Sequence, residues 1–535
     1  MRRGLAIEGS AVAVVVGLAL APSLLGLLAR ADAPRSGIPV SLSARDLWTT
    51  AWAVGAIVLV ATLIGWPVGW RASRLAPGRG LVLLLPLLLP SYLAYAGWGT
   101  LRAPGTWLGD LLLRGFAGGG APVSPIGPSG APAVTAATNA LPILASRLTA
   151  IVGLALWGWP IVAAVVGAGA RAFPSEALDA LRADGATARA RTFVVMCATW
   201  HLALLGALLL ALVVAGSAVP LHVAQLDTLA IRAWRWLDEL PPGEHWRVWW
   251  ACWPLLLVAG VGSVGVWRAA RARGGSDGGH AGGGGSSAGL GVLGWSALGA
   301  SVLAPAMLAA WSLKSASSLR RVWLVAWGPA WTSAAVAVGV GALAAALAAL
   351  TWRALERGGP GARAARVAML VAVAASLVPG VLIGSSAARG WSLVPEWLAD
   401  SWLPVVLAHA ARFGAIGVVA GWWLWATEPR ELRDVRALEV GGGWRAWWLG
   451  TGRWGDILAA GIVVALLSLH EIESAVMLRP ASSSGGGLAW LMLQWLHFAR
   501  LEDLSAGMLW MFGVGVVGAA ASGWLLGRNR GAAIP

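Results

Sequence analysis

Charged residues are scarce in this chain of 535 residues. Only 12% of its residues are charged, whereas 58% are hydrophobic and the mean hydropathy is +0.73; soluble domains carry about 25% charged residues. Apolar runs of about 20 residues recur along the chain, and this length crosses the hydrocarbon core of a bilayer. The composition therefore indicates a polytopic membrane protein and leaves no stretch for a large soluble domain.

Two further shortages exclude whole classes of site. Cys197 and Cys252 are the only cysteines, so no disulfide framework or cysteine-based metal cluster is available, and we expect both to be small apolar core residues. Lys314 is the only lysine, and no glycine-rich loop precedes it, whereas a phosphate-binding P-loop ends in Gly-Lys-Ser/Thr. The chain thus lacks a Walker A motif, and any ATP-driven step needs another polypeptide.

Arginine supplies almost all of the positive charge. The formal net charge of +15 would suggest nucleic acid as a partner of a soluble protein. In a chain this apolar, arginines at the edges of membrane spans explain the excess better, so we expect membrane lipids and no nucleic acid. The 36 tryptophans suit the interfacial belts of a membrane protein.

Twelve apolar segments are candidate membrane spans. They cover about residues 10–29, 50–70, 81–100, 149–169, 194–219, 249–267, 290–312, 329–352, 366–386, 403–427, 456–478 and 504–526. The first segment follows Met1-Arg2-Arg3 and precedes Ala31-Asp32-Ala33, which is also the pattern of a secretory signal. Because it is long enough to span, we favour a retained first helix.

A glycine- and serine-rich segment divides the chain into halves. Residues 268–289 contain G-G-S-D-G-G-H-A-G-G-G-G-S-S, which is the composition of a flexible linker. We expect one six-span unit over 1–267 and a second over 290–535, and the halves look like repeats, since Pro90 and Pro379 each interrupt an apolar run. Twelve spans place both termini on one side, and the distribution of basic residues predicts that this side is cytoplasmic.

A polar segment at residues 173–193 interrupts the apolar first half. It reads F-P-S-E-A-L-D-A-L-R-A-D-G-A-T-A-R-A-R-T-F. Glu176 and Asp179 suit the positive end of a short helix, and Asp184-Gly185 would end it, because glycine readily adopts the left-handed conformation. We expect an amphipathic helix on the cytoplasmic face, followed by a turn into the next span. From the residues alone, a handle for a soluble partner and a loop resting on lipid headgroups fit equally well.

The core of this segment, D-A-L-R-A-D-G-A-T, resembles the EAA loop of ABC-transporter inner-membrane permeases, whose pattern is roughly E-A-A-x-x-D-G-A. Asp179 stands at the Glu position, Asp184 and Gly185 match, and Arg182 lies at an open position. The resemblance makes these the ATPase-coupling residues of the first half: Glu176, Asp179, Ala180, Arg182, Asp184, Gly185 and Ala186.

A second polar segment, residues 428–453, lies at the corresponding place in the second half. Gly441 fits the glycine of the pattern, whereas Val435 and Arg436 replace the Glu and the first Ala. We therefore expect a second coupling contact, which includes Gly441 and departs from the family pattern.

Other runs extend the resemblance across most of the chain. L-P-L-L-L-P-S-Y-L-A-Y-A-G is similar to the third helix of fused, two-copy permeases of the ferric-iron type. S-L-H-E-I-E-S-A-V-M-L-R-P and the following L-A-W-L-M-L-Q-W-L-H-F-A-R-L-E-D-L-S-A-G-M-L are similar to the carboxy-terminal end of that subfamily.

The resemblance implies an all-α membrane protein of about 12 transmembrane helices in two six-helix repeats, each with a cytoplasmic coupling helix. The implied partners are a dimer of separate ATPase subunits and a periplasmic solute-binding protein, and the implied location is the bacterial inner membrane. Such a permease carries iron(III) or another small solute, such as thiamine, a polyamine or a phosphonate. It needs no cofactor and performs no bond chemistry.

Several polar residues are further candidates. His470, Glu471 and Glu473 lie in the expected eleventh span, and ionisable groups at membrane depth are functional candidates. His470 and Glu473 would share a helix face, which leaves a metal site open, but we favour packing or lining of a translocation path and assign no metal. We expect His201 and His409 to be interior histidines with satisfied hydrogen bonds, with a proton carrier as the alternative. Four acids of one outer loop are expected to form a solvated face, with a docking site for a basic partner as the alternative: Asp227, Asp238, Glu239 and Glu244.

Two other classes of protein remain as alternatives. A secondary transporter built of repeats and driven by an ion gradient would have discontinuous helices and buried carboxylates. A membrane-embedded enzyme, such as a lipid-linked glycosyltransferase, would need clustered acids or histidines at one interface. The two polar segments at corresponding places in the halves favour the permease.

Overall fold

The computed structural model describes the whole chain except residues 1–6, 29–35, 74, 76–79, 103–109, 111–139, 171–174, 225, 274–290, 314, 429–430, 432, 435–452, 481–485, 499 and 532–535. Within the described part every regular element is a helix, and there are no strands. The all-α prediction is therefore confirmed.

Eight helical segments of the described residues are long and apolar enough to cross a membrane. They are α1 (Ile7–Leu28), α2 (Ala44–Ala72), α6 (Ala140–Ala170), α8 (Ala188–Ala215), the continuous run α13–η4–α14 (Gly291–Leu298, Gly299–Leu303 and Ala304–Trp311), α15 (Ser317–Arg357), α19 (Leu403–Thr427) and α25 (Leu501–Gly531). Many large apolar side chains on these helices are exposed, including Leu63, Leu204, Val338 and Val517. Helices that are apolar on their outward faces too are typical of a multi-pass membrane protein.

Three further apolar stretches are each broken into two helices. The first break bends the chain by 74° between η1 (Leu81–Leu88) and α4 (Ser91–Gly99). The second bends it by 64° between η3–α11 (Pro242–Glu244 and His245–Ala251) and α12 (Trp253–Arg273). The third bends it by 106° between α16 (Gly359–Ser376) and α17 (Gly380–Trp391). Counting each pair as one span gives 11, and α22 (Trp454–Leu469) is a shorter apolar helix. Each of the twelve predicted segments falls on one of these helices, but the layout of twelve spans in two repeats stays a prediction.

Proline explains two of the breaks. Pro90 precedes α4 with φ −58° and ψ 130°, and Pro379 precedes α17 with φ −51° and ψ 133°. A proline has no N–H and restricts the preceding residue, so it starts a helix more readily than it continues one. The segments expected over 81–100 and 366–386 are therefore each a pair of helices at a sharp angle, broken at the proline that interrupts the apolar run.

Two other boundaries also differ from the prediction. Helix α15 has 41 residues, a length of about 60 Å, so it extends well beyond the expected 329–352 and beyond a hydrocarbon core of about 30 Å. Helix α22 ends at Leu469 and α23 (Glu473–Met477) follows after a break. The span expected over 456–478 is thus interrupted near its end.

Small residues let the long helices approach closely. A Cβ on Gly69 of α2 would lie 2.5 Å from the carbonyl oxygen of Ala163 on α6, and a Cβ on Gly417 of α19 would lie 2.3 Å from that of Ala344 on α15. Membrane helices gain packing contacts in this way without a hydrophobic driving force. Helix α2, the second predicted span, thus packs against α6, the fourth. In the other half α15, the eighth span, packs against α19, the tenth.

The first helix of each half packs against the opposite half. Helix α1 lies against α16 and α17, and α13 and α14 lie against α2 and α4. A Cβ on Gly26 of α1 would lie 1.8 Å from the carbonyl oxygen of Ser386, and one on Gly97 would lie 2.9 Å from the side chain of Pro305. The two predicted units are therefore interlocked, and the retention of the first helix stays a prediction.

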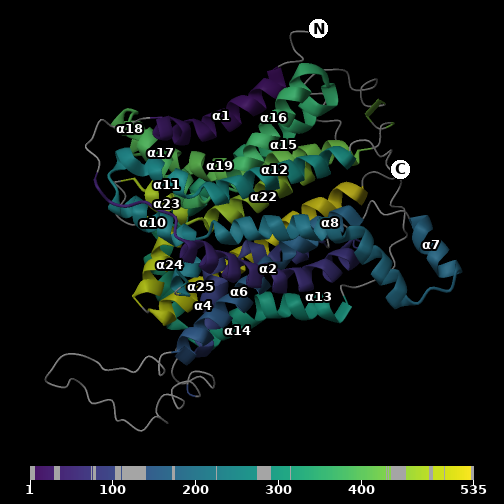
Figure 1. Ribbon diagram of the computed structural model, residues 1–535, viewed down its shortest axis with the longest axis horizontal. Coiled ribbons are helices and arrows are strands. Elements are labelled where there is room, and N and C mark those ends of the chain that lie inside the picture. The colour runs from purple at the N-terminus through teal and green to yellow at the C-terminus, as the bar shows by residue number, and fades with distance from the viewer. Residues whose placement is uncertain are drawn as a thin grey trace.

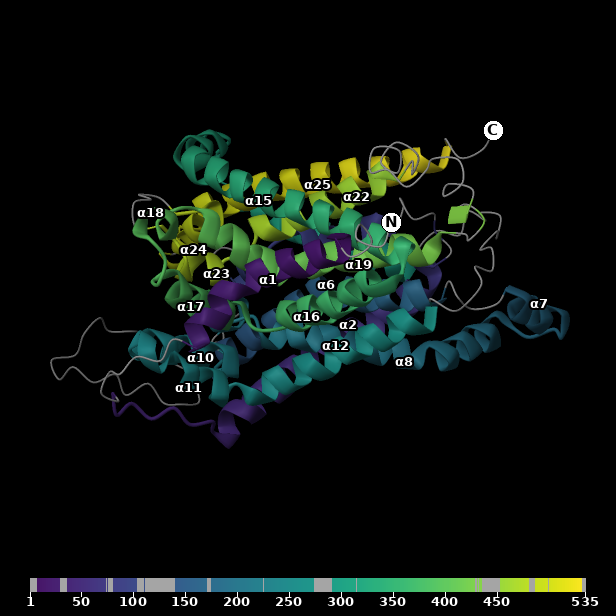
Figure 2. The same cartoon turned by 90° about the horizontal axis from the view of Figure 1, so that it is seen from above.

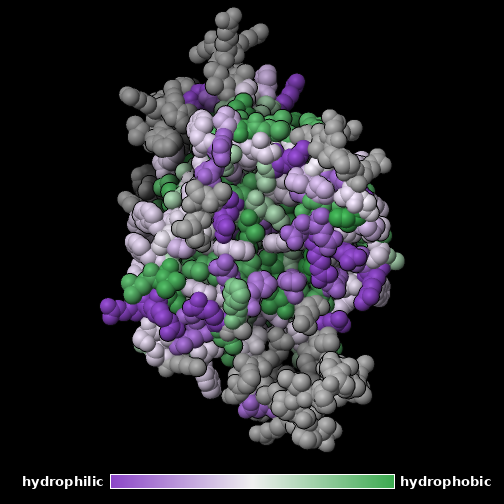
Figure 3. Space-filling view, turned by 90° about the vertical axis from the view of Figure 1, so that its left-hand side faces the viewer, coloured by the Kyte–Doolittle hydropathy of each residue, from purple (hydrophilic) through white to green (hydrophobic). Residues whose placement is uncertain are grey.

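The bundle has two distinct ends. The start of α1, the end of α25 and α7 (Ser175–Ala183) lie at one end, called the α7 end below (Figures 1 and 2). Helices α10 (Leu229–Glu239), α18 (Glu396–Ala399) and α24 (Leu488–His497) lie at the other, called the α24 end (Figures 1 and 2). Figure 3 looks onto the α24 end and shows many polar side chains among apolar ones. The described residues nearest the two termini thus lie at the same end, and the assignment of that end to the cytoplasm stays a prediction.

Candidate functional site

The break between α22 and α23 presents two carboxylates to the bundle interior. The backbone N–H of Glu471 still bonds the carbonyl of Ser468, at 3.3 Å, but α23 begins only at Glu473. Glu471 caps this new helix, since its Oε1 accepts from the N–H and the Oγ–H of Ser474, each at 3.2 Å. His470 and Glu473 therefore do not share the face of one continuous helix, and the expectation that they do is wrong.

Arg412 of α19 lies between the two carboxylates. Its Nη1 donates to Oε1 of Glu471 at 2.8 Å and to Oε2 of Glu473 at 3.2 Å. The three side chains are only 14%, 7% and 5% exposed. A buried charge needs a partner because its desolvation is costly, so Arg412 keeps both carboxylates in the interior. We call these three residues the Arg412 cluster.

The break before α17 makes room for this cluster. A Cβ on Gly380, the first residue of α17, would lie 1.5 Å from Nη1 of Arg412 and 2.9 Å from Oε1 of Glu471. A side chain at this position would require the guanidinium to shift. Gly380 therefore allows the close approach of Arg412, with Pro379 fixing the backbone that approaches.

Glu473 also binds the first half of the chain. Its Oε1 accepts the backbone N–H of Ala218 at 2.6 Å, and Ala218 lies between the end of α8 and α9 (Val219–Val223). Beside it, a Cβ on Gly216 would lie 3.3 Å from Cα of Pro379. The Arg412 cluster thus lies where broken helices of both halves meet, and two carboxylates face one guanidinium there.

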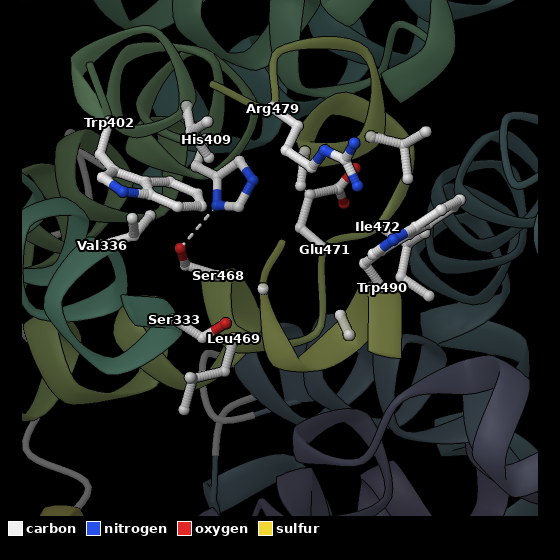
Figure 4. Close-up of a pocket in the computed structure, with 15 residues that line it drawn as sticks. Ser333, Val336, Trp402, His409, Ser468, Leu469, Glu471, Ile472, Arg479 and Trp490 are labelled. Carbon is white, nitrogen blue, oxygen red and sulfur yellow. Dashed lines mark hydrogen bonds between the residues drawn. The ribbon is translucent and has the colours of Figure 1, made fainter. Parts of the chain in front are cut away.

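A small cavity adjoins the Arg412 cluster (Figure 4). Its volume of about 30 Å³ is the room of one water molecule. Aliphatic side chains make up about half of its lining, and the polar and aromatic ones include Ser333, Trp402, His409, Ser468, Glu471 and Trp490.

His409 contributes an unsatisfied nitrogen beside this cavity. It is buried as predicted, and Nδ1 lies 2.8 Å from Oγ of Ser468 (Figure 4). Nε2 is buried and has no hydrogen-bond partner among the described residues. Because an unpaired buried polar atom is costly, this position suits a water molecule or a polar group of a passing solute.

The structure brings together only part of the predicted set. Glu471 and Glu473 share Arg412, but among the described residues no hydrogen bond or ion pair joins His470 to either of them. Within the same residues, no group of three or more His, Cys, Asp or Glu side chains is placed to hold a metal ion. The metal alternative for this segment therefore gains no support, whereas the burial of both glutamates keeps them candidates for the path.

Arg412 is the member that sequence reasoning missed. It stands within the apolar run 403–427, and an arginine at membrane depth is rare enough to be a functional candidate. That signal could have been used, but its partners, 59 and 61 residues further on, had no sequence signal.

The polar segment after α6 has the predicted helix–turn–helix form. Helix α7 ends in a turn in which the N–H of Ala186 bonds the carbonyl of Leu181 at 2.9 Å, and Gly185 has φ +74°. Thr187 then caps α8, since its Oγ accepts the N–H of Ala190 at 3.2 Å. A left-handed glycine after the last turn is a common way to end a helix.

Helix α7 projects beyond the bundle (Figures 1 and 2). Asp179 and Arg182 form an exposed ion pair at 2.6 Å, a type that stabilises a helix only slightly. The predicted coupling residues whose side chains are exposed are Asp179, Ala180, Arg182, Asp184 and Gly185. Ala186 is half-buried, and Glu176 belongs to α7 although its side chain is not described.

The second polar segment lies mostly outside the described residues. Residues 435–452, which contain Val435, Arg436 and Gly441, lie outside the described residues, as does 274–290 of the predicted linker. The coupling role of Gly441 stays a prediction.

Two expectations about single residues of α8 are wrong. His201 is exposed on α8, edge-on to Trp200 with ring centroids 6.3 Å apart, rather than interior. Cys197 is exposed on the same helix, whereas Cys252 is buried as expected. The face of α8 that carries both residues points outward. The largely apolar sequence of this helix did not reveal which face that is.

Glu244 does not belong to a solvated face. It is 5% exposed and accepts the backbone N–H of Ser36, the Oγ–H of Ser36 at 3.1 Å and a guanidinium N–H of Arg247. The segment before α2 folds against it, a contact across more than 200 residues that the sequence does not indicate. The other three acids are exposed as expected: Asp227, Asp238 and Glu239.

Comparison with known proteins adds no relative. No family model matches the chain, and neither a curated protein nor a solved structure is significantly similar to it.

Proposed function

We propose that this chain is the permease subunit of an ABC importer, which moves a small solute from a periplasmic binding protein to the cytoplasm with energy from a separate ATPase. The observation that carries the proposal is the turn after α7. There, the residues that resemble the EAA pattern form an exposed helix that ends at a left-handed Gly185, away from the bundle and joined directly to α8. A soluble subunit that grips α7 can move α8.

The pairing of features between the halves supports two six-helix units. Pro90 and Pro379 have nearly the same backbone angles before a buried helix. The first helix of each half packs against the other half, and the chain is interrupted after both α8 and α22. Related interruptions at corresponding places are typical of transporters whose path lies between repeats.

The Arg412 cluster lies at the meeting point of these interruptions, and we assign it to the translocation path or its gate. Glu473 holds the backbone of Ala218 from the other half, so separation of the halves breaks this contact. Because one guanidinium faces two carboxylates, the cluster carries one excess negative charge when all three groups are ionised. Such a site favours a cationic solute, in line with iron(III) or a polyamine.

A secondary transporter is the second candidate, because buried carboxylates between discontinuous helices are also its hallmark. The two candidates differ in their energy source. Uptake into vesicles that contain only this chain, driven by a proton or sodium gradient without ATP, would identify the secondary transporter. Uptake that requires the ATPase subunit and ATP inside would identify the importer.

The decisive experiment is co-purification of the chain with candidate ATPase subunits, carried out with Gly185→Arg and Asp184→Lys. A matched control is Gly358→Arg, since Gly358 also has a positive φ of +69° and open space around it. We expect the two variants to lose the ATPase and solute-stimulated hydrolysis, because each places a bulky cation in the turn, and the control to keep both. Intact binding in Gly185→Arg and Asp184→Lys would show that α7 is not the coupling helix.

A further inference from the structure

Two histidines from opposite halves meet at the α24 end of the bundle. His222 lies on α9 and His497 is the last residue of α24, and their ring centroids are 6.1 Å apart with the planes inclined by 55°. Both side chains are exposed. The sequence separates them by 275 positions (497 − 222), so only the tertiary fold pairs them.

The backbone under each ring is firmly held. The N–H of His222 donates to the carbonyl of Ala218 at 2.9 Å, and Ala218 itself is tied to Glu473. On the other side, Trp495 of α24 is buried, and its carbonyl accepts the N–H of Arg500 at 2.8 Å. The two imidazoles therefore stand on anchored turns, and His222 lies one helical turn beyond Ala218, whose N–H binds Glu473.

Burial and the neighbouring groups favour the neutral form of His222. Partial burial lowers the pKa of His222 from 6.5, the interactions with His497 and Arg235 lower it further, and Asp227 opposes the shift. Asp227 and Arg235 pair with each other at 2.9 Å. A neutral imidazole has the free lone pair that a metal ion needs.

We propose that His222 and His497 together bind a divalent transition-metal ion, of which Zn²⁺ is the simplest probe. Imidazole suits Zn²⁺, Cu²⁺ and Ni²⁺. With a metal–nitrogen distance of about 2.0 Å, a ring centroid lies about 3 Å from the ion, so two rings on one ion are about 5–6 Å apart. The observed 6.1 Å needs only a small rotation of the side chains.

Such a site binds weakly and reversibly. The two imidazoles supply only half of a tetrahedral shell, and no third His, Cys, Asp or Glu completes a cluster with them among the described residues, so water fills the remaining positions. The ion joins α9 of one half to α24 of the other, and α9 begins next to Ala218, which binds Glu473 of the Arg412 cluster. If the proposed permease function holds, this site is where a cation first meets the junction of the halves; the binding itself does not depend on that function.

The test is a Zn²⁺ titration of the full-length chain, purified without a polyhistidine tag, in lipid nanodiscs at pH 7.5. The chain has seven histidines, so ¹⁵N-labelled imidazoles give few enough resonances to assign by substitution. We expect two resonances to shift together and saturate, with the affinity falling at least about tenfold in His222→Ala and in His497→Ala. His201→Ala, which removes another exposed histidine, is the matched control and should leave the affinity unchanged.

Three results would overturn the proposal. They are independent titration of His222 and His497, unchanged affinity in either variant, and binding only at millimolar Zn²⁺, which indicates an adventitious ion only. Gel filtration of each variant shows whether it is folded, and Ni²⁺ or Cu²⁺ titration of the folded single variants supplies a second measurement. None of these measurements involves the ATPase, so failure here leaves the permease proposal standing, and failure of ATPase binding leaves the metal site standing.

Discussion

Replacement of Gly380 by alanine tests whether the Arg412 cluster depends on the break before α17. The new Cβ would lie 1.5 Å from Nη1 and 2.7 Å from Cζ of Arg412, and 2.9 Å from Oε1 of Glu471. Real Cβ atoms do not come this close to their neighbours, so the guanidinium must shift, and we expect the shift to break its pairing with the carboxylates. Loss of one partner of a buried ion pair costs about 3–5 kcal/mol, and we expect Gly380→Ala to lower the free energy of unfolding by about that amount.

The assay is equilibrium unfolding in mixed detergent and SDS, followed by circular dichroism. Gly260→Ala in α12 is the control, because a Cβ there meets no atom within 4 Å and alanine favours a helix over glycine by about 1 kcal/mol. We expect the control to be neutral or slightly stabilised. A double-mutant cycle with Arg412→Met isolates the contact: in that background the guanidinium is gone, so Gly380→Ala should cost less than about 1 kcal/mol.

Two outcomes would refute the reasoning. A loss of less than about 1 kcal/mol in Gly380→Ala would mean that the guanidinium has another stable position, since an uncompensated buried charge costs more. An equal loss with and without Arg412 would mean that alanine clashes with something other than the guanidinium.

Two further predictions concern Glu473 and His222. Glu473→Gln keeps an acceptor for the N–H of Ala218, whereas Glu473→Ala leaves that buried donor unpaired, so in the same unfolding assay the alanine variant should be less stable than the glutamine variant by about 1–3 kcal/mol; equal stabilities would contradict the cross-half bond. Because the pKa of His222 is lowered from 6.5, the folded state binds fewer protons than the unfolded chain, and stability is lost as the pH falls through about 6.5 toward the folded-state pKa. The midpoint of thermal denaturation should therefore depend less on pH between 7.5 and 5 in His222→Gln than in the unsubstituted chain. An unchanged pH dependence would show that His222 does not contribute to it.

Local features of the chain were predictable from the sequence. The apolar segments were found because the bilayer fixes their length and composition, and the helix–turn–helix at 175–187 was found because a left-handed glycine has a local signature. The interruptions of the helices were only partly predictable. Pro90 and Pro379 were noted, but the angles of 74° and 106° depend on how the second helix of each pair packs.

The site itself needed the tertiary structure. Arg412 and its carboxylates are charged residues in apolar runs, and nothing in the sequence says that they meet or that Gly380 must be glycine for them to fit. The same holds for Glu244 with Ser36 and for His222 with His497, which are contacts between segments remote in the chain.

The sequence by itself determined that this protein is helical and embedded in a membrane, because scarcity of charge and apolar runs of membrane length act through the solvent and require no knowledge of neighbours. It also placed the exposed turn at Gly185, which one glycine and its own helix define. Only the tertiary structure decided which charges are paired, where the halves touch and which glycines allow a close approach. The sequence of a helix that is apolar on all sides does not show which face contacts which neighbouring helix. Small-residue contacts and a few buried polar bonds select the arrangement, above all the bonds of Arg412 with Glu471 and Glu473.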